Sequence, residues 1–255
     1  MDKSASANDE TPEAEPRRER RSGYEALQYL FRPCTDDGEG FLHLWLGNTR
    51  MGKTYANNIV INEILKRKHS DVIFTIDDKN PSKPQYAGTQ RANPEHLLMS
   101  PLLPTEDNKH INFRGVSFRS NLADHVHHGD VAQMVWNLKR TNPPLRLVLN
   151  IDELGDATNG KQSWLDDANA QIYRKGAGVG ISTTATTQMP QIVPREAFGL
   201  SQTIGIFRLD AREIDYLVKY RLVTPDVVGL MQLLERGDFL LYVRGEGLLP
   251  HVFRF

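Results

Sequence analysis

Eight consecutive residues, Gly47 to Thr54 (GNTRMGKT), follow the pattern G-x-x-x-x-G-K-[ST]. A short apolar run, Phe41 to Leu46, precedes them, and residues 55–68 follow with apolar side chains at helical spacing. A strand that turns through a glycine-containing loop into a helix is typical of α/β folds. No other part of the sequence constrains the fold as strongly.

The chemistry that this loop favours is phosphate binding. Its glycines let the backbone curl so that N–H groups point at phosphate oxygens, and the following helix adds its dipole. Lys53 would reach the β- and γ-phosphates, and the Thr54 hydroxyl would ligate a metal ion. We therefore expect ATP with Mg²⁺. The residues expected to contact the nucleotide are Gly47, Asn48, Thr49, Arg50, Met51, Gly52, Lys53, Thr54 and Tyr55.

The remaining chain alternates between strand-like and helix-like runs. The runs expected to form strands are Phe41 to Leu46, Val72 to Ile76, Leu145 to Ile151, Val179 to Thr187, Thr203 to Leu209 and Phe239 to Val243. Helices are expected over 55–68, 131–139, 162–175 and the region from 211 to about 234. This alternation predicts an α/β fold with a mostly parallel central sheet and helices on both faces. Residues 80–110, rich in proline and polar side chains, are expected to leave the sheet.

Two acidic residues follow the strand expected over Leu145 to Ile151. Asp152 is predicted to hold the Mg²⁺ hydration shell, as a carboxylate next to a phosphate-binding loop does. Glu153 is predicted to polarise a water molecule for attack on the γ-phosphate. A base for water favours hydrolysis over transfer to a bulky acceptor, so we expect an ATPase.

Two further polar residues are candidates for catalysis. Gln188 follows the strand expected over Val179 to Thr187, where a polar side chain can sense the γ-phosphate and help to place the water. Arg174 precedes a glycine-rich turn and is a candidate arginine finger that a neighbouring subunit would supply. A basic residue near a helix end is the ordinary alternative for Arg174. Arg195 and Arg208 are weaker candidates for the same role.

The whole-chain composition sets the remaining limits. Residues 1–22 have no large apolar side chain after Met1, which predicts a disordered, charged N-terminal tail before one domain over 23–255. The net charge of −1 gives no direct sign of nucleic-acid binding, although basic side chains could gather on one surface. One cysteine among 255 residues is typical of a reducing compartment, and no apolar run is long enough to cross a membrane. We therefore expect a soluble intracellular protein.

The ordered set GNTRMGKT, LVLNIDE, YRKGAGVGISTTATTQMP and ERGDFLLYVRGEGLLPHVFRF resembles the HerA/FtsK superfamily of DNA-translocating ATPases. The strand that ends in Thr187-Gln188 discriminates more than the phosphate-binding loop does. The resemblance covers about residues 40–255. Within the superfamily, the small size of the chain is typical of the genome-packaging ATPases of tailless viruses with internal membranes. Asn48 and Arg50 depart from the small residues that the family often has in this loop.

The resemblance implies a RecA-like core, a homo-oligomeric and hexameric ring, and double-stranded DNA in its pore. A packaging role further implies a portal protein at a capsid or membrane vertex as partner, and a location in the host cytoplasm or the virion. The leading hypothesis is therefore an ATP-driven motor that packages a viral genome. A secretion or conjugation ATPase, a small-molecule P-loop kinase and a non-hydrolysing regulator are the alternatives.

Overall fold

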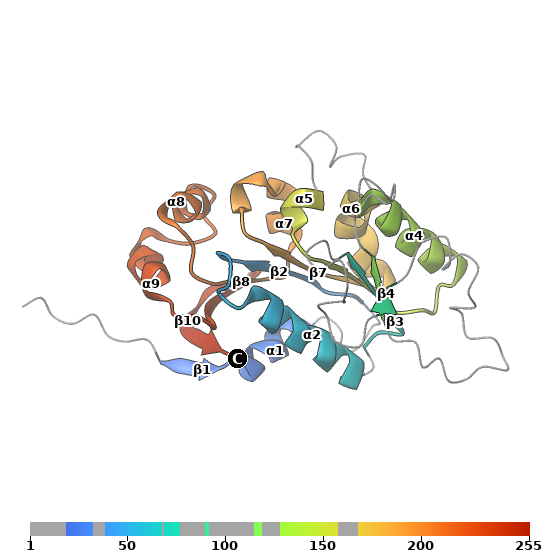
Figure 1. The fold of residues 1–255 in the computed structure, drawn as a ribbon, viewed down its shortest axis with the longest axis horizontal. Helices are drawn as coiled ribbons and strands as arrows, with labels where there is room; N and C mark the ends of the chain where they lie inside the picture. Colours follow the sequence, from blue (N-terminus) through green and yellow to red (C-terminus); the bar gives the residue numbers. More distant parts are fainter. Residues whose placement is uncertain are drawn as a thin grey trace, which may run out of the picture.

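The chain forms an α/β structure around one mixed sheet of ten strands (Figure 1). This computed structural model describes residues 19–32, 39–67, 69–76, 90–91, 115–118, 128–157 and 168–255. The strand order is β1-β10-β9-β8-β2-β7-β6-β3-β5-β4. All neighbouring strands run parallel except β9, which is antiparallel to both β8 and β10. The expected α/β fold with a mostly parallel sheet is confirmed.

The strands have the following bounds: β1 Arg20–Ser22, β2 Leu42–Leu46, β3 Val72–Ile76, β4 Gln90–Arg91, β5 Gly115–Phe118, β6 Leu147–Ile151, β7 Ile181–Thr187, β8 Thr203–Ile206, β9 Asp238–Val243 and β10 Gly247–Arg254. The central strands β2, β3, β6, β7 and β8 are buried at every residue. Parallel strands covered on both faces read as continuous apolar or threonine-rich runs, which is why the sequence located these strands.

The helices cover both faces of the sheet. They are α1 Gly23–Phe31, α2 Lys53–Arg67, α4 His128–Thr141, α5 Leu154–Ala157, α6 Ala168–Gln171, α7 Arg195–Leu200, α8 Ala211–Lys219 and α9 Val228–Leu233. A π-helical turn, η2 Ile172–Gly176, continues α6, and three short 3₁₀ turns are η3 Ala177–Val179, η4 Pro190–Ile192 and η5 Pro225–Val227. Figure 1 shows α1 and α2 on one side of the sheet and α4 to α7 on the other.

Two apolar cores result from this layering. One lies between the sheet and the helices α1 and α2, and it includes Trp45, Phe207 and Phe239. The other lies on the opposite face, where α4, α6, α7, α8 and α9 contribute buried residues such as Val135 and Met231. Because both faces are covered, functional side chains of the central strands can meet solvent only at the strand ends.

Several expected elements differ from those observed. The single helical region expected after residue 211 is divided into α8, η5 and α9, and the proline at position 225 opens the intervening turn. Residues 20–22, which the sequence placed in the N-terminal tail, form β1 beside the C-terminal strand β10. Residues 1–18 lie outside the described residues, as does most of the 80–110 excursion apart from β4.

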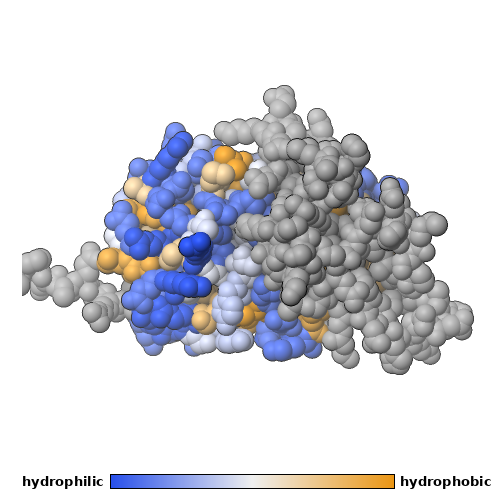
Figure 2. Space-filling model, in the orientation of Figure 1, coloured by the Kyte–Doolittle hydropathy of each residue, from blue (hydrophilic) through white to orange (hydrophobic). Residues whose placement is uncertain are grey.

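One face of the described surface is mainly hydrophilic (Figure 2). On the face drawn in Figure 2, hydrophobic residues appear as small separate patches among hydrophilic ones, to the left of the grey atoms. Within the described part of the chain, no helix combines the length and apolar character needed to span a bilayer.

Candidate active site

Three strand ends bring the predicted site residues to one edge of the sheet. β2, β7 and β6 are parallel neighbours, with Leu46 paired to Thr187 and Ile151 paired to Ala185. The loop from Gly47 to Thr54, the pair Asp152-Glu153 and Gln188 each follow the carboxyl end of one of these strands. In open α/β sheets ligands bind outside this edge.

The backbone of the Gly47–Thr54 loop takes conformations that glycine permits. Gly52 has φ 115°, in the left-handed region that side chains rarely adopt. A Cβ atom at Gly47 would lie 2.6 Å from Cβ of Phe207, so the loop packs directly on the residue that follows β8. Arg50 has φ 64° although it is not glycine, which costs about 1 kcal/mol.

This loop holds a cradle of unbonded amides. The backbone N–H groups of Thr49, Arg50, Gly52, Thr54 and Tyr55 donate to no acceptor among the described residues. Converging N–H groups at the start of a helix bind anions, because the helix dipole adds to the partial charges of the amides. The 15-residue helix α2 begins at Lys53, within this loop. The cradle therefore fits the phosphate groups of a nucleotide.

Lys53 is folded over the same loop. Its ammonium group donates to the carbonyl oxygens of Gly47 at 2.5 Å and Asn48 at 2.9 Å, and its side chain is buried. Burying an ammonium group is costly unless hydrogen bonds or counter-charges compensate. The two carbonyls hold the charge at the phosphate cradle.

Asp152 follows β6 and is fully buried. It lies at the edge of the sheet that also carries the loop Gly47 to Thr54, here called the P-loop. Its Oδ1 accepts a hydrogen bond of 3.0 Å from the hydroxyl of Thr186 on β7, which fixes the carboxylate. Carboxylate and hydroxyl oxygens are the protein ligands that Mg²⁺ prefers. Asp152 and Thr54 each carry an oxygen ligand of the kind that a magnesium ion takes.

Glu153 is buried with its carboxylate fastened to the end of β7. Oε1 accepts from the Thr187 hydroxyl at 2.7 Å, and the backbone N–H of Gln188 reaches Oε1 and Oε2 at 3.1 and 3.2 Å. The backbone N–H of Glu153 donates to the Thr186 hydroxyl at 3.2 Å. Glu153 has φ 66°, another strained position at this edge. Such strained residues persist only where surrounding contacts hold them, and they are common at functional sites.

Gln188 joins the loop to Glu153. Its side-chain Oε1 accepts a short hydrogen bond from the hydroxyl of Thr49, and its backbone N–H holds the Glu153 carboxylate. Hydrogen bonds thus link Thr49, Gln188 and Glu153 into one group. The contact between Thr49 and Gln188 itself has no signal in the sequence.

A buried polar network lies beneath these residues, and sequence reasoning missed it. Asn57 of α2 donates to Oδ1 of Asn150 at 2.7 Å and accepts from the hydroxyl of Thr184 at 2.6 Å. Asn150 in turn donates to Thr75 on β3 at 3.3 Å. Buried polar side chains that bond to one another fix a unique packing. An asparagine inside the apolar run LVLNI was the available signal.

The P-loop is also fastened to its neighbours by contacts that the sequence did not predict. Asn48 Nδ2 donates to Oδ1 of Asp210 at 2.7 Å, and the Asn48 N–H donates to the carbonyl of Arg208 at 2.9 Å. The N–H of Gly237 donates to the carbonyl of Met51 at 2.9 Å. The departure of Asn48 from a small residue is thus explained by its contact with Asp210 before α8.

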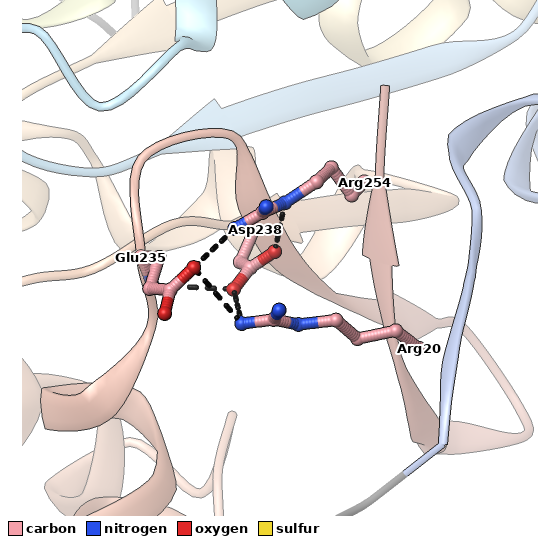
Figure 3. A network of polar contacts seen from close by, with 4 residues as sticks. All are labelled: Arg20, Glu235, Asp238 and Arg254. Carbon is pink, nitrogen blue, oxygen red and sulfur yellow. Dashed lines mark hydrogen bonds and ion pairs between the residues drawn. The ribbon is translucent and has the colours of Figure 1, made fainter.

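A network of four charged residues supports the Gly237 segment (Figure 3). Asp238 is buried and accepts from Arg20 of β1 at 2.9 Å and from Arg254 of β10 at 2.6 Å. Arg254 also bonds Glu235 at 2.7 Å, which lowers the pKa of that carboxyl. The first and last described strands thereby brace a turn that contacts the P-loop.

Arg174 lies in η2, which leads to the amino end of β7, whereas Gln188 follows the carboxyl end. A strand of this length spans about 20 Å. The guanidinium forms a bidentate pair with Glu196 of α7, with Nε–Oε1 at 2.6 Å and a second contact at 2.7 Å. The chain path therefore separates Arg174 from the P-loop of its own subunit.

The two weaker arginine candidates have different surroundings. The Arg195 guanidinium lies over the ring of Tyr220 at 5.0 Å, a cation–π contact that occupies it within the subunit. Arg208 is exposed, and its carbonyl contacts Asn48, so it lies beside the P-loop of its own chain.

No family model and no curated protein matches this chain. Among solved structures, the genome packaging NTPase B204 of Sulfolobus turreted icosahedral virus 2, in complex with ATPγS, is similar with a TM-score of 0.60 and 15% identity, over 84% of this chain and 97% of that chain. B204 of Sulfolobus turreted icosahedral virus, described as a DNA-packaging ATPase, gives a TM-score of 0.62 and 16% identity, over 84% and 97%.

A second kind of protein shares the fold. VirB4 of Thermoanaerobacter pseudethanolicus has a TM-score of 0.62 and 10% identity, over 88% of this chain and 92% of that chain. At these identities the likeness concerns the fold. It confirms the structural resemblance that the sequence motifs indicated.

Proposed function

We propose that this chain binds ATP with Mg²⁺ and hydrolyses the β–γ phosphoanhydride bond. The observation that carries the proposal is the meeting of the amide cradle, Asp152, Glu153 and Gln188 at one sheet edge. The shared fold of B204, a packaging NTPase solved in complex with ATPγS, supports the same conclusion.

Each site residue has a role in this proposal. The amides of the loop and Lys53 hold the phosphates, and Lys53 offsets their charge. Thr54 and Asp152 would hold Mg²⁺, which would neutralise charge on the phosphate oxygens. Glu153 takes a proton from the attacking water, and Gln188 senses the γ-phosphate.

We further propose that hydrolysis drives double-stranded DNA through a homo-oligomeric, hexameric ring, and that the DNA is a viral genome entering a capsid. The remote position of Arg174 supports a ring, because the chain would need this group from a neighbouring subunit. In this proposal the motor works in the host cytoplasm or at the packaging vertex of the virion, where a portal protein is its partner.

The fold does not select the moving polymer, since one fold can host different functions. A secretion or conjugation ATPase is therefore the second candidate. Duplex DNA distinguishes the two, because a DNA motor couples its hydrolysis to bound DNA.

The test measures ATP hydrolysis by the purified chain with and without duplex DNA, and particle size in the same samples. We expect DNA to stimulate hydrolysis in an assembled particle. Glu153→Gln should lower kcat by about 100-fold or more, because it removes the base, while nucleotide binding persists. Hydrolysis that ignores duplex DNA would favour the second candidate. A monomer that phosphorylates a nucleoside would contradict the motor.

A further inference from the structure

Gln188 is held at two separate points. Its backbone N–H contacts both carboxylate oxygens of Glu153, and its side-chain Oε1 accepts from the Thr49 hydroxyl. Thr49 belongs to the loop with the unbonded amides, and its own N–H is one of them. One residue thus connects the phosphate cradle to the candidate base.

The polarity of the side-chain contact determines what Gln188 can recognise. The carboxamide has an acceptor end, Oε1, and a donor end, Nε2. The Thr49 hydroxyl occupies the acceptor end, and Nε2 has no hydrogen-bond partner among the described residues. Both N–H bonds of Nε2 are therefore left to donate to a ligand. Such a donor suits a phosphate oxygen, which accepts hydrogen bonds.

The position of Glu153 depends on the same residue. The carboxylate is held by the Gln188 N–H and the Thr187 hydroxyl, and the backbone of Glu153 has φ 66°. A non-glycine residue in this conformation is kept there by its surroundings. A shift of Gln188 therefore changes the contacts that hold Glu153.

We propose that Thr49 is a positioning residue, which binds the acceptor end of Gln188 so that its donor end faces the γ-phosphate. A triphosphate would then satisfy Gln188 Nε2, and a diphosphate would not. Because the Gln188 backbone holds Glu153, Thr49 links γ-phosphate recognition to the placement of the base. The inference rests on the proposed function of this site.

The main variant is Thr49→Val, which keeps the β-branched shape and the backbone amide and removes the hydroxyl. We expect kcat to fall about tenfold, the factor that corresponds to about 1.4 kcal/mol and to a typical hydrogen bond. Thr49→Ser should recover most of that loss. The affinity for Mg·ADP should stay within about twofold, because a diphosphate has no γ-phosphate for Gln188 to bind.

Two comparisons separate positioning from a general defect. In a Gln188→Ala background, Thr49→Val should cost no further kcat, since both changes remove one interaction. Thr224 is exposed and its side chain makes no capping hydrogen bond, so Thr224→Val is the matched control and should leave kcat and both affinities at wild-type values. Losses that multiply in the double variant would overturn the proposal, as would an equal loss of Mg·ADP affinity.

A binding measurement keeps the test independent of hydrolysis. The ratio of the Kd for Mg·ADP to the Kd for Mg·ATPγS reports γ-phosphate recognition directly, and we expect Thr49→Val to lower it about tenfold. If the wild-type chain binds both nucleotides without hydrolysing ATP, the proposed ATPase fails while this ratio still decides the role of Thr49. An unchanged ratio in Thr49→Val would overturn the inference whether or not ATP is hydrolysed.

Discussion

The threonines of β7 give the site much of its geometry. Four of the seven residues of this strand are threonine, and three of them bond a site or network residue: Thr184 bonds Asn57, Thr186 bonds Asp152 and Thr187 bonds Glu153. A β-branched side chain suits a strand, and its hydroxyl can hold a buried polar partner. The strand therefore packs in the core and orients the carboxylates together.

His43 on β2 is a buried ionisable residue outside the site. Its Nδ1 lies 2.7 Å from the Thr203 hydroxyl, and Nε2 has no partner in the described structure. Burial lowers the pKa of His43 to about 3, and a hydrogen bond with the backbone of Thr203 raises it by less. The ring is therefore neutral in the folded state at every pH where the protein is expected to work.

This predicts an acid-sensitive contribution to stability. The unfolded chain protonates His43 near pH 6.5, and the folded chain does so near pH 3. The stability that the neutral ring contributes is therefore complete above pH 6.5, and the free energy of unfolding decreases as the pH falls from 6.5 to 3. Between about pH 7.5 and about pH 4.5, His43 should account for a loss on the order of 3 kcal/mol in the free energy of unfolding. Urea unfolding at several pH values measures it.

The matched variants for this prediction are His43→Asn and His251→Asn. Asparagine keeps a polar atom near Nδ1 for Thr203 but does not titrate, so the stability of His43→Asn should vary less with pH. His251 is half-buried on β10, and its variant should retain the wild-type slope. Equal slopes for His43→Asn and the wild type would contradict the assignment.

At the scale of elements, the contact between β2 and β8 fixes the strand that leads into the P-loop. Trp45 on β2 is fully buried and packs against Phe207 and Phe239, with ring centroids 5.5 and 5.2 Å away. Its indole also covers Gly205 of β8, where a Cβ atom would lie 2.1 Å from two ring atoms. Glycine at this position allows the close approach of the indole to the neighbouring strand.

Gly205→Ala should destabilise the protein by about 3 kcal/mol, because the rigid indole is enclosed and cannot move aside. Gly229→Ala is the matched control: Gly229 lies in α9, and a Cβ there would meet nothing within 4 Å. Alanine is favoured over glycine in helices, so this control should be neutral or stabilising by up to about 1 kcal/mol. Chemical denaturation compares the two, and similar free energies of unfolding would show that the indole accommodates the methyl group.

At the scale of the whole molecule, the two ends of the described chain meet beside the site. β1 pairs with β10, and Arg20 and Arg254 from these strands both bond Asp238. The P-loop therefore receives support from both ends of the described chain. Arg174, by contrast, lies toward the amino end of β7 and pairs with Glu196. To act as an arginine finger it would have to leave Glu196 and bind a phosphate of the nucleotide held by a neighbouring subunit.

A mixing experiment tests this arrangement. Arg174→Ala and Lys53→Ala should each be inactive alone, and an equal mixture should recover about a quarter of the wild-type ATPase rate, because random assembly joins an intact P-loop to an intact arginine at one interface in four. Light scattering establishes that the variants co-assemble. Co-assembled particles without recovered activity would show that Arg174 does not act across the interface. Arg195→Ala is the control: it should be active alone, and its equal mixture with Lys53→Ala should give about half of the wild-type rate, because half of the P-loops are intact.

Much of the fold followed from local patterns. The loop at Gly47–Thr54 has a recognisable form because one stretch of backbone makes the whole cradle. The sequence located the buried strands β2, β3, β6 and β7 because each is a short, unbroken run of residues that suit a buried strand. Asp152, Glu153 and Gln188 could be predicted to lie together, since parallel strands place their carboxyl ends at one edge.

The tertiary structure decided which side chains touch. The pairing of β1 with β10, the bond from Thr49 to Gln188 and the group formed by Asn57, Asn150 and Thr184 join residues far apart in the chain. No local period or motif encodes such contacts, because they depend on how the layers pack around the sheet. The sequence by itself determined the phosphate cradle and the strands that carry the carboxylates. The packing of those strands determined how Glu153 and Gln188 are held.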